Sequence, residues 1–412
     1  MSASRAGAVL SDRGVVTAPL ILDWGPEQAV FEVTNEEFQK NCQKIFGYAY
    51  DADAMRNIRE LFASSATKGI FYRLNAGEKA SNIYAEAVYG GTRGNALKIV
   101  IAANTEDTNK FDVTTLLDLK QVDKQTVAKA SELVPNSYVK FKADAALAAT
   151  AGVNLSGGTN GEDVTGAEHS AYLAAVEPYS FHVMCCPVTD EATKGLYVAF
   201  TKRMRDEAGV KFQTVVYRKS DADYEGIISV ENKAAELEQG LVYWVAGAEA
   251  ACAVNKTLEN RIYNGEFTVD TSHTQTQLSD GIQAGKFLFH KSGDDVRVLE
   301  DINTLVTYTI EKSEDFSINQ VIRVLDQIGN DIAVIFNTKY LGVAPNITSG
   351  HVSLWNDILT YNRKMEKVNA IKDVSPDDLV VEKGESKRAV VVSNPVTPVC
   401  CMGQLYMTVI VR

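Results

Sequence analysis

The sequence lacks most of the features by which membrane, secreted and nucleic-acid-binding proteins are recognised. It has no apolar run long enough to span a bilayer, and its start, Met-Ser-Ala-Ser-Arg-Ala-Gly, has no apolar signal-peptide core. The formal net charge of −12 over 412 residues argues against the extended basic stripe that nucleic acid requires. We therefore expect an acidic, multidomain protein that neither inserts into membranes nor binds nucleic acid directly.

Cysteine is scarce, and its spacing does not resemble a disulfide framework. The chain has six cysteines, which form two adjacent pairs and two single positions, and it has no C-x-x-C motif. We expect reduced thiols in a protein that is assembled in the cytosol. The six positions are Cys42, Cys185, Cys186, Cys252, Cys400 and Cys401.

Motifs for catalysis and for cofactor or metal binding are missing as well. Residues 157–161 (Gly-Gly-Thr-Asn-Gly) lack the lysine of a phosphate-binding loop, so we interpret them as a turn at a domain junction. None of the five histidines belongs to a close ligand pair, and there is no G-x-S-x-G elbow. Cys185 and Cys186 end an apolar strand, where buried inert thiols are expected rather than a nucleophile. We expect no catalytic residue, cofactor or metal. A hydrolase remains a rival hypothesis that lacks a nucleophile.

The first 150 residues predict a mixed α and β segment followed by a small insert of mostly β structure. Thr34 and Glu37 form a capping box at the start of a helix. The insert begins after the turn-rich residues 89–95 and contains only a short helical signal near residues 126–133. The predicted strands are 14–22, 69–74, 96–102, 111–119 and 137–143, and the predicted helices are 35–46 and 54–63.

After residue 161 the predicted strands and helices alternate along the chain. This alternation favours an α/β domain with a largely parallel sheet. The predicted helices are 169–177, 191–207 and 240–254, and the predicted strands are 180–185, 211–217, 226–230, 286–290 and 295–299.

Two amphipathic helices follow. An apolar stripe runs from Ile318 to Ile332 in the first, and Leu354, Ile358, Tyr361, Met365 and Val368 form the stripe of the second, at residues 351–370. Three cations, Arg363, Lys364 and Lys367, lie on the opposite side of this second helix. A basic face on an acidic protein predicts a docking surface for an acidic partner, and an ordinary solvated face is the alternative.

The last residues contain two strand-like runs, 387–392 and 404–411, separated by a linker with two prolines. In the second run successive side chains point to two opposite faces in alternation, as in a β-strand. An unpaired apolar strand is an aggregation hazard, so this run is either the final strand of its own sheet or a strand lent to another subunit. One face carries Leu405, Met407, Val409 and Val411, and the other carries Tyr406, Thr408 and Ile410.

Several of these stretches, in this order, resemble the contractile tail sheath proteins of bacteriophages and related phage-tail-like particles. The resemblance covers nearly the whole chain and is closest at the C-terminal end. The similar stretches are residues 13–16 with 22–26, 89–95 (Tyr-Gly-Gly-Thr-Arg-Gly-Asn), 155–161 (Leu-Ser-Gly-Gly-Thr-Asn-Gly), 387–392, 395–398 and 405–411.

This resemblance implies an α/β and α+β multidomain fold. A core α+β domain would come from both chain ends (14–88 and 315–394), with a β-sandwich insert at 89–154. Residues 155–314 would form a subtilisin-like α/β domain without catalytic residues, between a short N-terminal arm (1–13) and a C-terminal arm (395–412). Either residues 4–10 form a minimal N-terminal arm, or part of that arm is missing from the sequence.

The resemblance also implies a structural function rather than an enzymatic one. Subunits would stack helically as six-fold rings around an inner tail tube, and contraction would drive the tube through the bacterial envelope. The particle, assembled in the host cytoplasm, would be a virion tail that ejects a genome or a headless bacteriocin-like tail. Besides the subunit itself, the partners would be the tube, baseplate and tail terminator proteins.

Two sites are carried over from the family. Residues 405–411 would join a neighbour's sheet, and Arg363, Lys364 and Lys367 would face the tube. A non-contractile shell or adhesin built by strand exchange is the alternative.

Overall fold

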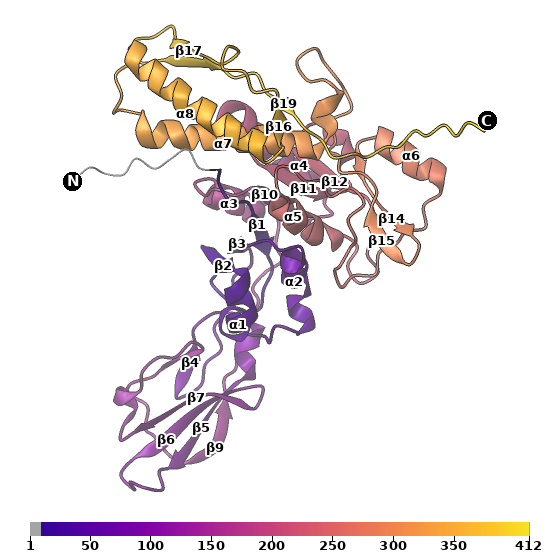
Figure 1. Ribbon diagram of the computed structural model, residues 1–412. Coiled ribbons are helices and arrows are strands. Elements are labelled where there is room, and N and C mark those ends of the chain that lie inside the picture. Colours follow the sequence, from indigo (N-terminus) through magenta and orange to yellow (C-terminus); the bar gives the residue numbers. More distant parts are fainter. Residues whose placement is uncertain (1–9, 412) are drawn as a thin grey trace. The chain divides into compact units, whose positions relative to one another are not determined.

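A computed structural model of the chain describes residues 10–411, and its ribbon is shown in Figure 1. The chain forms two units, each built from separated stretches of sequence. Unit 1 combines the segment that ends at Val16 with Glu60–Thr67 and Phe181–Arg412, and unit 2 comprises Thr17–Arg59 and Lys68–Ser180. The expected minimal N-terminal arm at residues 4–10 lies, apart from Leu10, outside the described residues.

Unit 2 starts with three strands and a helix whose beginning the capping box predicts. Its strand order is β1-β3-β2, and β2 and β3 are antiparallel. The Thr34 side chain accepts a hydrogen bond from the Glu37 backbone, and the Glu37 carboxylate accepts one from the Thr34 N–H, which confirms the box. On the buried side of α1, Phe46 packs edge-on against Phe38 and Phe71. The elements are β1 (Val15–Leu20), β2 (Val30–Thr34), α1 (Asn35–Phe46), a 3-10 turn (Asp53–Met55), α2 (Arg56–Ala63), β3 (Lys68–Arg73) and α3 (Gly166–Val176).

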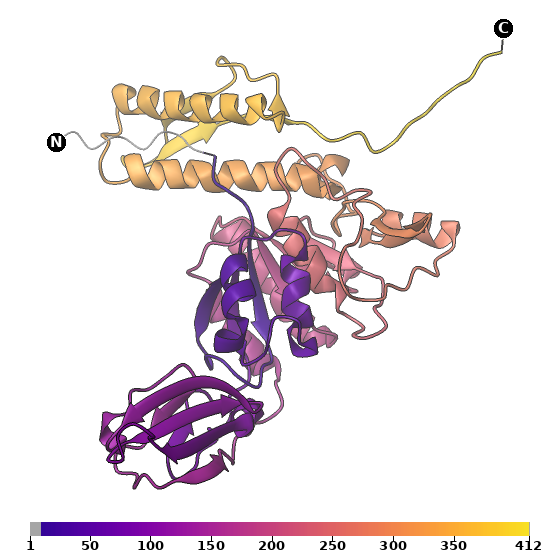
Figure 2. The ribbon, with the colours of Figure 1, turned by 60° about the horizontal axis from the view of Figure 1, so that its bottom comes forward.

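The predicted β insert is a four-stranded antiparallel sheet with a small two-stranded sheet beside it in the core (Figure 2). The sheet order is β7-β6-β5-β9, and β4 pairs with β8. The helical signal predicted near residues 126–133 is wrong in its first part, because strand β7 extends to Val127 and only Ala130–Glu132 forms a 3-10 turn. β7 is a polar edge strand, so pairing with β6 rather than its own pattern decides its structure. The strands are β4 (Ala85–Ala87), β5 (Leu97–Ala103), β6 (Phe111–Leu117), β7 (Lys120–Val127), β8 (Val139–Phe141) and β9 (Thr150–Asn154), and a further 3-10 turn is Thr92–Ala96.

The insert is joined to the rest of unit 2 where backbone segments cross closely. Buried Arg73 donates from Nη1 to Gly90 O at 2.9 Å. Gly91 has a φ of 129°, and a Cβ there would stand 1.9 Å from Asp23 O, so only glycine fits. The junction turn predicted at residues 157–161 meets this crossing, since a Cβ on its second glycine would stand 2.4 Å from Gly91 O. These glycines serve close backbone packing.

Unit 1 contains the parallel sheet that the alternating pattern predicts. Its strand order is β13-β12-β11-β10, and all three pairs are parallel. Every residue of β10, β11 and β12 is buried, as expected for a parallel sheet covered on both faces. The single strand predicted at residues 286–290 is wrong, because the ladder partner changes from β12 to β15 after Phe287. The elements are β10 (Val183–Cys186), α4 (Glu191–Lys202) with a π-turn (Arg203–Glu207), β11 (Gln213–Tyr217), a 3-10 turn (Ser220–Ala222), β12 (Ile227–Val230), α5 (Leu241–Ala251), α6 (Gln275–Gln283), β13 (Lys286–Phe287), β14 (Phe289–Ser292) and β15 (Asp295–Val298).

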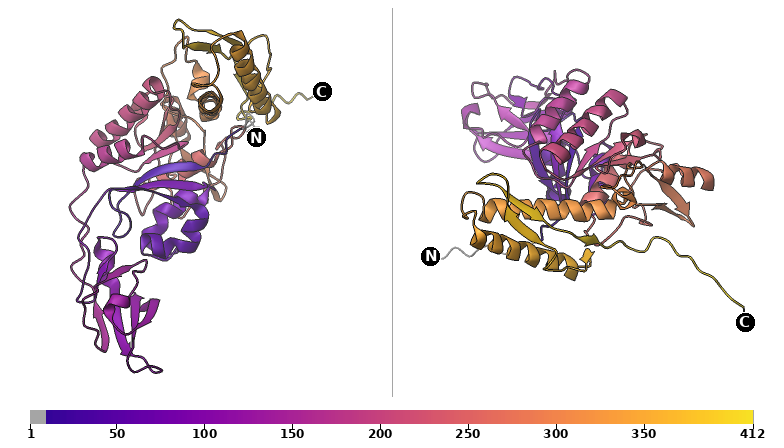
Figure 3. Two further views of the ribbon diagram at one scale, coloured as in Figure 1. Left: turned by 90° about the vertical axis from the view of Figure 1, so that its left-hand side faces the viewer. Right: turned by 90° about the horizontal axis from the view of Figure 1, so that it is seen from above.

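Two long helices follow in unit 1 and lie side by side (Figures 2 and 3). The predicted stripe of α8 is buried from Leu354 to Met365 with Ile328 and Ile335 of α7 in one apolar core. Val368, the last residue of that stripe, follows the end of α8 and is only partly buried. The remaining strands form two separate pairs, β17–β18 and β16–β19. The elements are a 3-10 turn (Glu314–Ser317), α7 (Asn319–Lys339), α8 (Thr348–Lys367), β16 (Ile371–Lys372), β17 (Val380–Lys383), β18 (Val390–Ser393) and β19 (Thr397–Pro398).

The other side of α7 is fixed by buried charges. Arg323 Nη2 lies 2.6 Å from Glu249 Oε2 and 3.2 Å from Asp301 Oδ2, and all three side chains are buried. Burial raises the pKa of Glu249, whereas Arg323 holds the pKa of Asp301 below its usual value against the opposing effect of burial. Arg205 forms a second buried pair with Asp326 at 2.6 Å. Because removing one partner of such a pair is strongly destabilising, α7 is a fixed part of unit 1.

The burial of His182 makes the stability of unit 1 depend on pH. The Val15 N–H donates to His182 Nδ1 at 3.2 Å, and burial, with the nearby charge of Arg13, lowers the pKa of His182 to about 3. The unfolded chain takes up this proton near pH 6.5, so the stabilisation is complete above that pH and is lost as the pH falls towards 3. We expect the free energy of unfolding to fall by about 2 kcal/mol between pH 7 and 5 through this group.

Denaturant unfolding across this pH range measures the effect. His182→Gln keeps an acceptor for Val15 but has no proton to gain, so it should lose this part of the slope. His290→Gln, in the hairpin β14–β15, should retain it. Equal slopes in all three proteins would contradict the assignment to His182.

Candidate functional site

The C-terminal tail, defined here as residues 402–411, exposes a run of large apolar side chains. Leu405, Met407 and Val409 are 86%, 74% and 75% exposed. The tail forms no strand in the single chain, and residues 10–411 supply no ladder partner for it. Figure 2 shows it running away from α7 and α8 as a single trace. The final strand predicted at residues 404–411 is therefore absent from the chain's own sheets.

The residues just before the tail are firmly held. Thr397 and Pro398 pair with β16, and the Val399 N–H donates to Ala370 O at 2.9 Å. Gln320 of α7 then contacts the backbone on both sides of Cys400: its Nε2 donates to Val399 O at 3.1 Å, and its Oε1 accepts from the Cys401 N–H at 3.0 Å. The chain becomes free only after Cys401.

The hairpin β17–β18 is a two-stranded sheet with open edges. Its register pairs Val381 with Val392 and Lys383 with Val390. The Gly384 N–H donates to Ala389 O, so the antiparallel alternation places the amides of Val390 and Val392 on the open side of β18. Among the described residues, no strand covers that edge.

An apolar groove lies along β18, and we call it the β18 groove. It consists of two adjoining hollows of about 350 Å³ each, which share Phe336, Leu354 and Val390. The first hollow is closed by α7, α8 and Val392, and the second by the α7–α8 connection and the tip of the hairpin. The other lining residues of the first hollow are Gly329, Ile332, Ala333 and Ile358. The second hollow is partly polar, and its other lining residues are Tyr340, Leu341, Gly342, Ala344, Pro345, Asn346, Gly350, His351, Lys387 and Arg388.

The three cations predicted on α8 are all on its exposed side. Arg363, Lys364 and Lys367 are exposed, whereas their neighbour Met365 is fully buried. Asp357, near the middle of α8, is paired with Lys339 of α7 at 3.0 Å. The structure thus brings the basic residues together on one surface, and what this surface binds stays a prediction.

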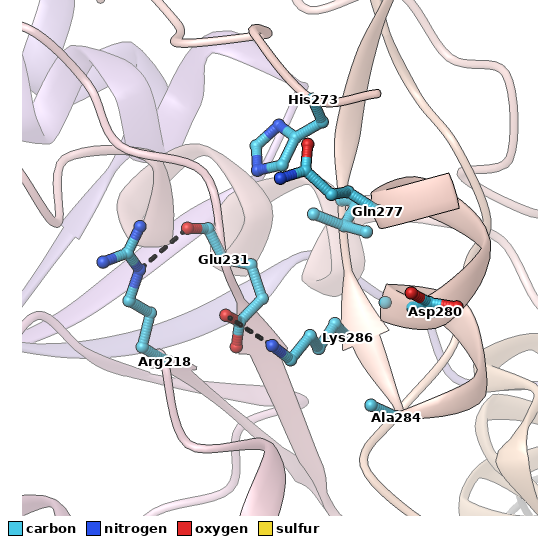
Figure 4. Close-up of a pocket in the computed structure, with 9 residues that line it drawn as sticks. Arg218, Glu231, His273, Gln277, Asp280, Ala284 and Lys286 are labelled. Carbon is cyan, nitrogen blue, oxygen red and sulfur yellow. Dashed lines mark hydrogen bonds and ion pairs between the residues drawn. The ribbon is translucent and has the colours of Figure 1, made fainter. Parts of the chain in front are cut away.

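A polar pocket of about 620 Å³ lies at the carboxyl ends of β11 and β12, where α/β enzymes hold their ligands (Figure 4). Arg218 Nε donates to Glu231 O at 3.0 Å, and Lys286 Nζ lies 3.6 Å from the Glu231 carboxylate. The pocket is lined by Arg218, Glu231, His273, Gln277, Asp280, Gly281, Ala284, Lys286 and Leu288, so no serine, threonine or cysteine reaches it. Within the lining, Lys286 forms an ion pair with Glu231, whereas Arg218 pairs at 4.0 Å with Glu238, which is not a lining residue.

Other chemical sites find equally little support in the described part of the chain. Burial raises the pKa of the Cys185 and Cys186 thiols, which agrees with inert cysteines. Residues 10–411 contain no cluster of three His, Cys, Asp or Glu side chains able to hold a metal. In the same range, every helix is too short or too polar to cross a membrane.

Comparison with known proteins agrees with a structural reading of these features. The chain resembles the sheath tail protein of Desulfitobacterium hafniense, with 36% identity over 97% of this chain and 96% of that one, at a TM-score of 0.85. The chain belongs to the phage tail sheath protein family. This confirms the family that the motifs indicated, and the hydrolase hypothesis is wrong, because the sheath protein is structural and not an enzyme.

The matches to phage tail sheath domains extend over nearly the whole chain. Residues 13–74 match the tail sheath protein Gp18 domain III N-terminal region, and residues 74–163 match the phage tail sheath protein beta-sandwich domain. Residues 162–304 and 311–412 match the phage tail sheath protein central domain and the phage tail sheath C-terminal domain.

Two further similarities extend this result. The phage-like element PBSX protein XkdK of Bacillus subtilis (strain 168) is 34% identical over 97% of this chain and 93% of its own length. The anti-feeding prophage helical sheath in its contracted state covers 100% of this chain and 97% of its own at a TM-score of 0.60, and at 11% identity this similarity shows the fold alone.

Sequence reasoning singled out residues 405–411, whose role as a donated strand stays a prediction, but it missed the elements around them. β17, β19 and the Gln320 contacts were not predicted, and the run 387–392 was not recognised as one side of an open hairpin. The available signal was three consecutive valines beside two amphipathic helices. That signal becomes specific only when α7, α8 and β18 are brought together.

Proposed function

We propose that this sheath protein polymerises by lending its tail as a strand to the β17–β18 hairpin of a neighbouring subunit. The subunits would surround an inner tail tube as helically stacked six-fold rings, and contraction of this lattice would drive the tube through a bacterial envelope. The observation that carries the proposal is an alternating apolar tail without a partner in a chain that also has an apolar groove beside an open strand edge.

The tail has the chemistry of a donor strand. Leu405, Met407, Val409 and Val411 fall on one face, which suits the apolar β18 groove. Residues 404–411 carry no charge, so nothing opposes burial of the backbone in a sheet. Strand addition supplies affinity through main-chain hydrogen bonds and specificity through the alternating side chains.

The β18 edge has the chemistry of an acceptor. The outward amides of Val390 and Val392 offer the ladder positions, and the apolar groove beside them receives side chains from an added strand. The outer edge of β17 carries Glu382 and Lys383, charges of the kind that discourage edge pairing. We therefore assign the tail to β18.

The expected energies favour the tail as the durable link between subunits. A seven-residue strand paired on one edge gains about three or four hydrogen bonds worth roughly 0.5–1.5 kcal/mol each. Burial of Leu405, Met407 and Val409 adds roughly 1.5–3 kcal/mol for each side chain. A single exposed ion pair contributes only about 0–1 kcal/mol.

The basic surface of α8 fits the weaker role of tube attachment. Arg363, Lys364 and Lys367 are exposed and would meet an acidic tube surface, so their contacts would be screened by salt and easily exchanged. During contraction these contacts would break while the donated strands stay paired. The subunits would then move as rigid bodies into a better-packed lattice without consuming nucleotide.

Removal of residues 403–412 tests the donor. We expect a folded, soluble subunit with an unchanged melting temperature, because this segment buries little in the single chain. The same protein should form no sheath in negative-stain electron microscopy. Long regular tubes from the truncated protein would refute the strand exchange.

Val392→Pro tests the acceptor. Proline removes an N–H on the open side of β18 and leaves the ladder to β17 intact, so the subunit should stay folded but assemble poorly. Val392→Thr is the matched control, since it keeps the N–H and the branched shape. This control should assemble as well as the wild type. If Val392→Pro assembles like Val392→Thr, the acceptor lies elsewhere.

The double charge reversal Arg363→Glu with Lys367→Glu tests the tube surface. We expect loss of attachment to the tube, measured by co-sedimentation at low salt, while contracted sheath still assembles. Arg363→Lys with Lys367→Arg keeps both charges and should attach normally. Loss of assembly in both lattice states would give this helix another role.

A further inference from the structure

We infer that Gln320 is the fixed end of the C-terminal arm and that the movable joint is confined to residues 402–404. This inference rests on the proposed strand exchange and adds where the arm is held, how far it reaches and what limits the movement of neighbouring subunits.

The side chain of Gln320 acts like a short piece of a neighbouring strand. Its amide nitrogen donates to Val399 O and its amide oxygen accepts from the Cys401 N–H, so one side chain satisfies two backbone groups on opposite sides of Cys400. Gln320 itself is 2% exposed and lies in the first turn of α7. We call these two contacts of Gln320 the clamp. The clamp is therefore part of a buried and regular helix.

The element that carries the clamp cannot yield easily. The buried contacts of Arg323 with Glu249 and of Asp326 with Arg205 fix α7 to the parallel-sheet region of unit 1. The N-terminal side of the chain is tied to the same helix, where Ser11 Oγ donates to Asp331 Oδ1 at 2.5 Å. Both ends of the described chain thus leave the body of unit 1 from α7.

The proline-containing linker is held against the body of unit 1 over its second half. Pro398 lies in β19, paired with Ile371, and the Val399 N–H is bonded to Ala370 O. A Cβ on Gly403 would meet the Glu259 carboxylate at 2.7 Å, so the chain still touches the surface there. The last backbone hydrogen bond to Gln320 is at Cys401, so the joint begins at Met402, about seven residues later than Pro395.

This placement sets a short reach for the arm. If residues 405–411 are paired as a strand, residues 402–404 span the gap, which is roughly 10 Å at the rise of an extended chain. The acceptor edge of the neighbour must stay within that distance of Cys401 in the extended and in the contracted lattice. Large rotations of a subunit are then allowed, but only about a point near the clamp.

Hydrogen–deuterium exchange of the single subunit tests the clamp without requiring assembly. In the wild type, the amides of Val399 and Cys401 should exchange slowly and those of residues 405–411 without protection. Gln320→Ala should speed exchange at Cys401 by about two- to tenfold, the effect of one lost hydrogen bond, and should leave Val399 protected through Ala370. Asn337→Ala, an exposed position on the same helix, should change neither. Exchange at wild-type Cys401 as fast as at Leu405 would overturn the clamp.

Changes of linker length test the reach. Deletion of Met402 and Gly403 removes two residues, preserves the side-chain alternation and should abolish tube formation with a normal melting temperature. Insertion of Gly-Ser after Gly403 also preserves the alternation and should allow tubes to form. Tubes from the shortened protein would overturn the short joint, and tubes from the protein without residues 403–412 would separately refute strand exchange.

Discussion

The organisation of this sheath protein depends on one constraint: a backbone amide or carbonyl that leaves water must find a hydrogen-bond partner. The tail carries apolar side chains that favour burial, but within residues 10–411 it has no ladder on which to bury them. The β18 edge lacks a partner strand: its outward amides lie beside an apolar groove, and no described strand pairs with them. Neither shortage is relieved within residues 10–411. In the proposed strand exchange two copies would relieve both, and a head-to-tail contact that does not close into a ring would generate a helical lattice.

In the proposed contractile lattice the exchanged strands would need a rigid body to which they are attached, and α7 would meet this requirement through its two unlike sides. One side supplies Ile328 and Ile335 to the apolar core shared with α8. The other carries Arg323 and Asp326 in buried ion pairs. Buried pairs add little net stability compared with apolar packing, but they tolerate very few alternative geometries. The orientation of α7, and therefore the direction in which the clamp at Gln320 releases the tail, is fixed by charge rather than by apolar contact alone.

The features that sequence could predict are those whose physical cause is local. The capping box of Thr34 and the apolar stripe of α8 each depend on residues a few positions apart, and both are present in the structure. The polar edge strand β7 was missed because its partner β6, not its own pattern, makes it a strand. In the sequence Gln320 is an ordinary polar residue of a helix. Its partners Val399 and Cys401 lie some 80 residues later and come close to it only in the folded chain. Family resemblance singled out residues 405–411 as the proposed donor strand, whereas the Gln320 contacts and the β18 groove could be seen only in the tertiary structure.

The composition of the tail follows from the two requirements placed on it. A charged side chain within residues 404–411 would protect the free subunit from unwanted pairing, and it would equally oppose pairing with the intended neighbour. In the proposed lattice the charges are instead on the acceptor hairpin. Glu382 and Lys383 discourage strand pairing at the edge of β17, whereas the valines of β18 leave its edge available for pairing. The short joint after Cys401 adds a second restriction, because a strand tethered within roughly 10 Å of its clamp samples few edges. Selectivity then arises from geometry and from charge on the receiving hairpin, so the tail itself can remain wholly uncharged and bind durably.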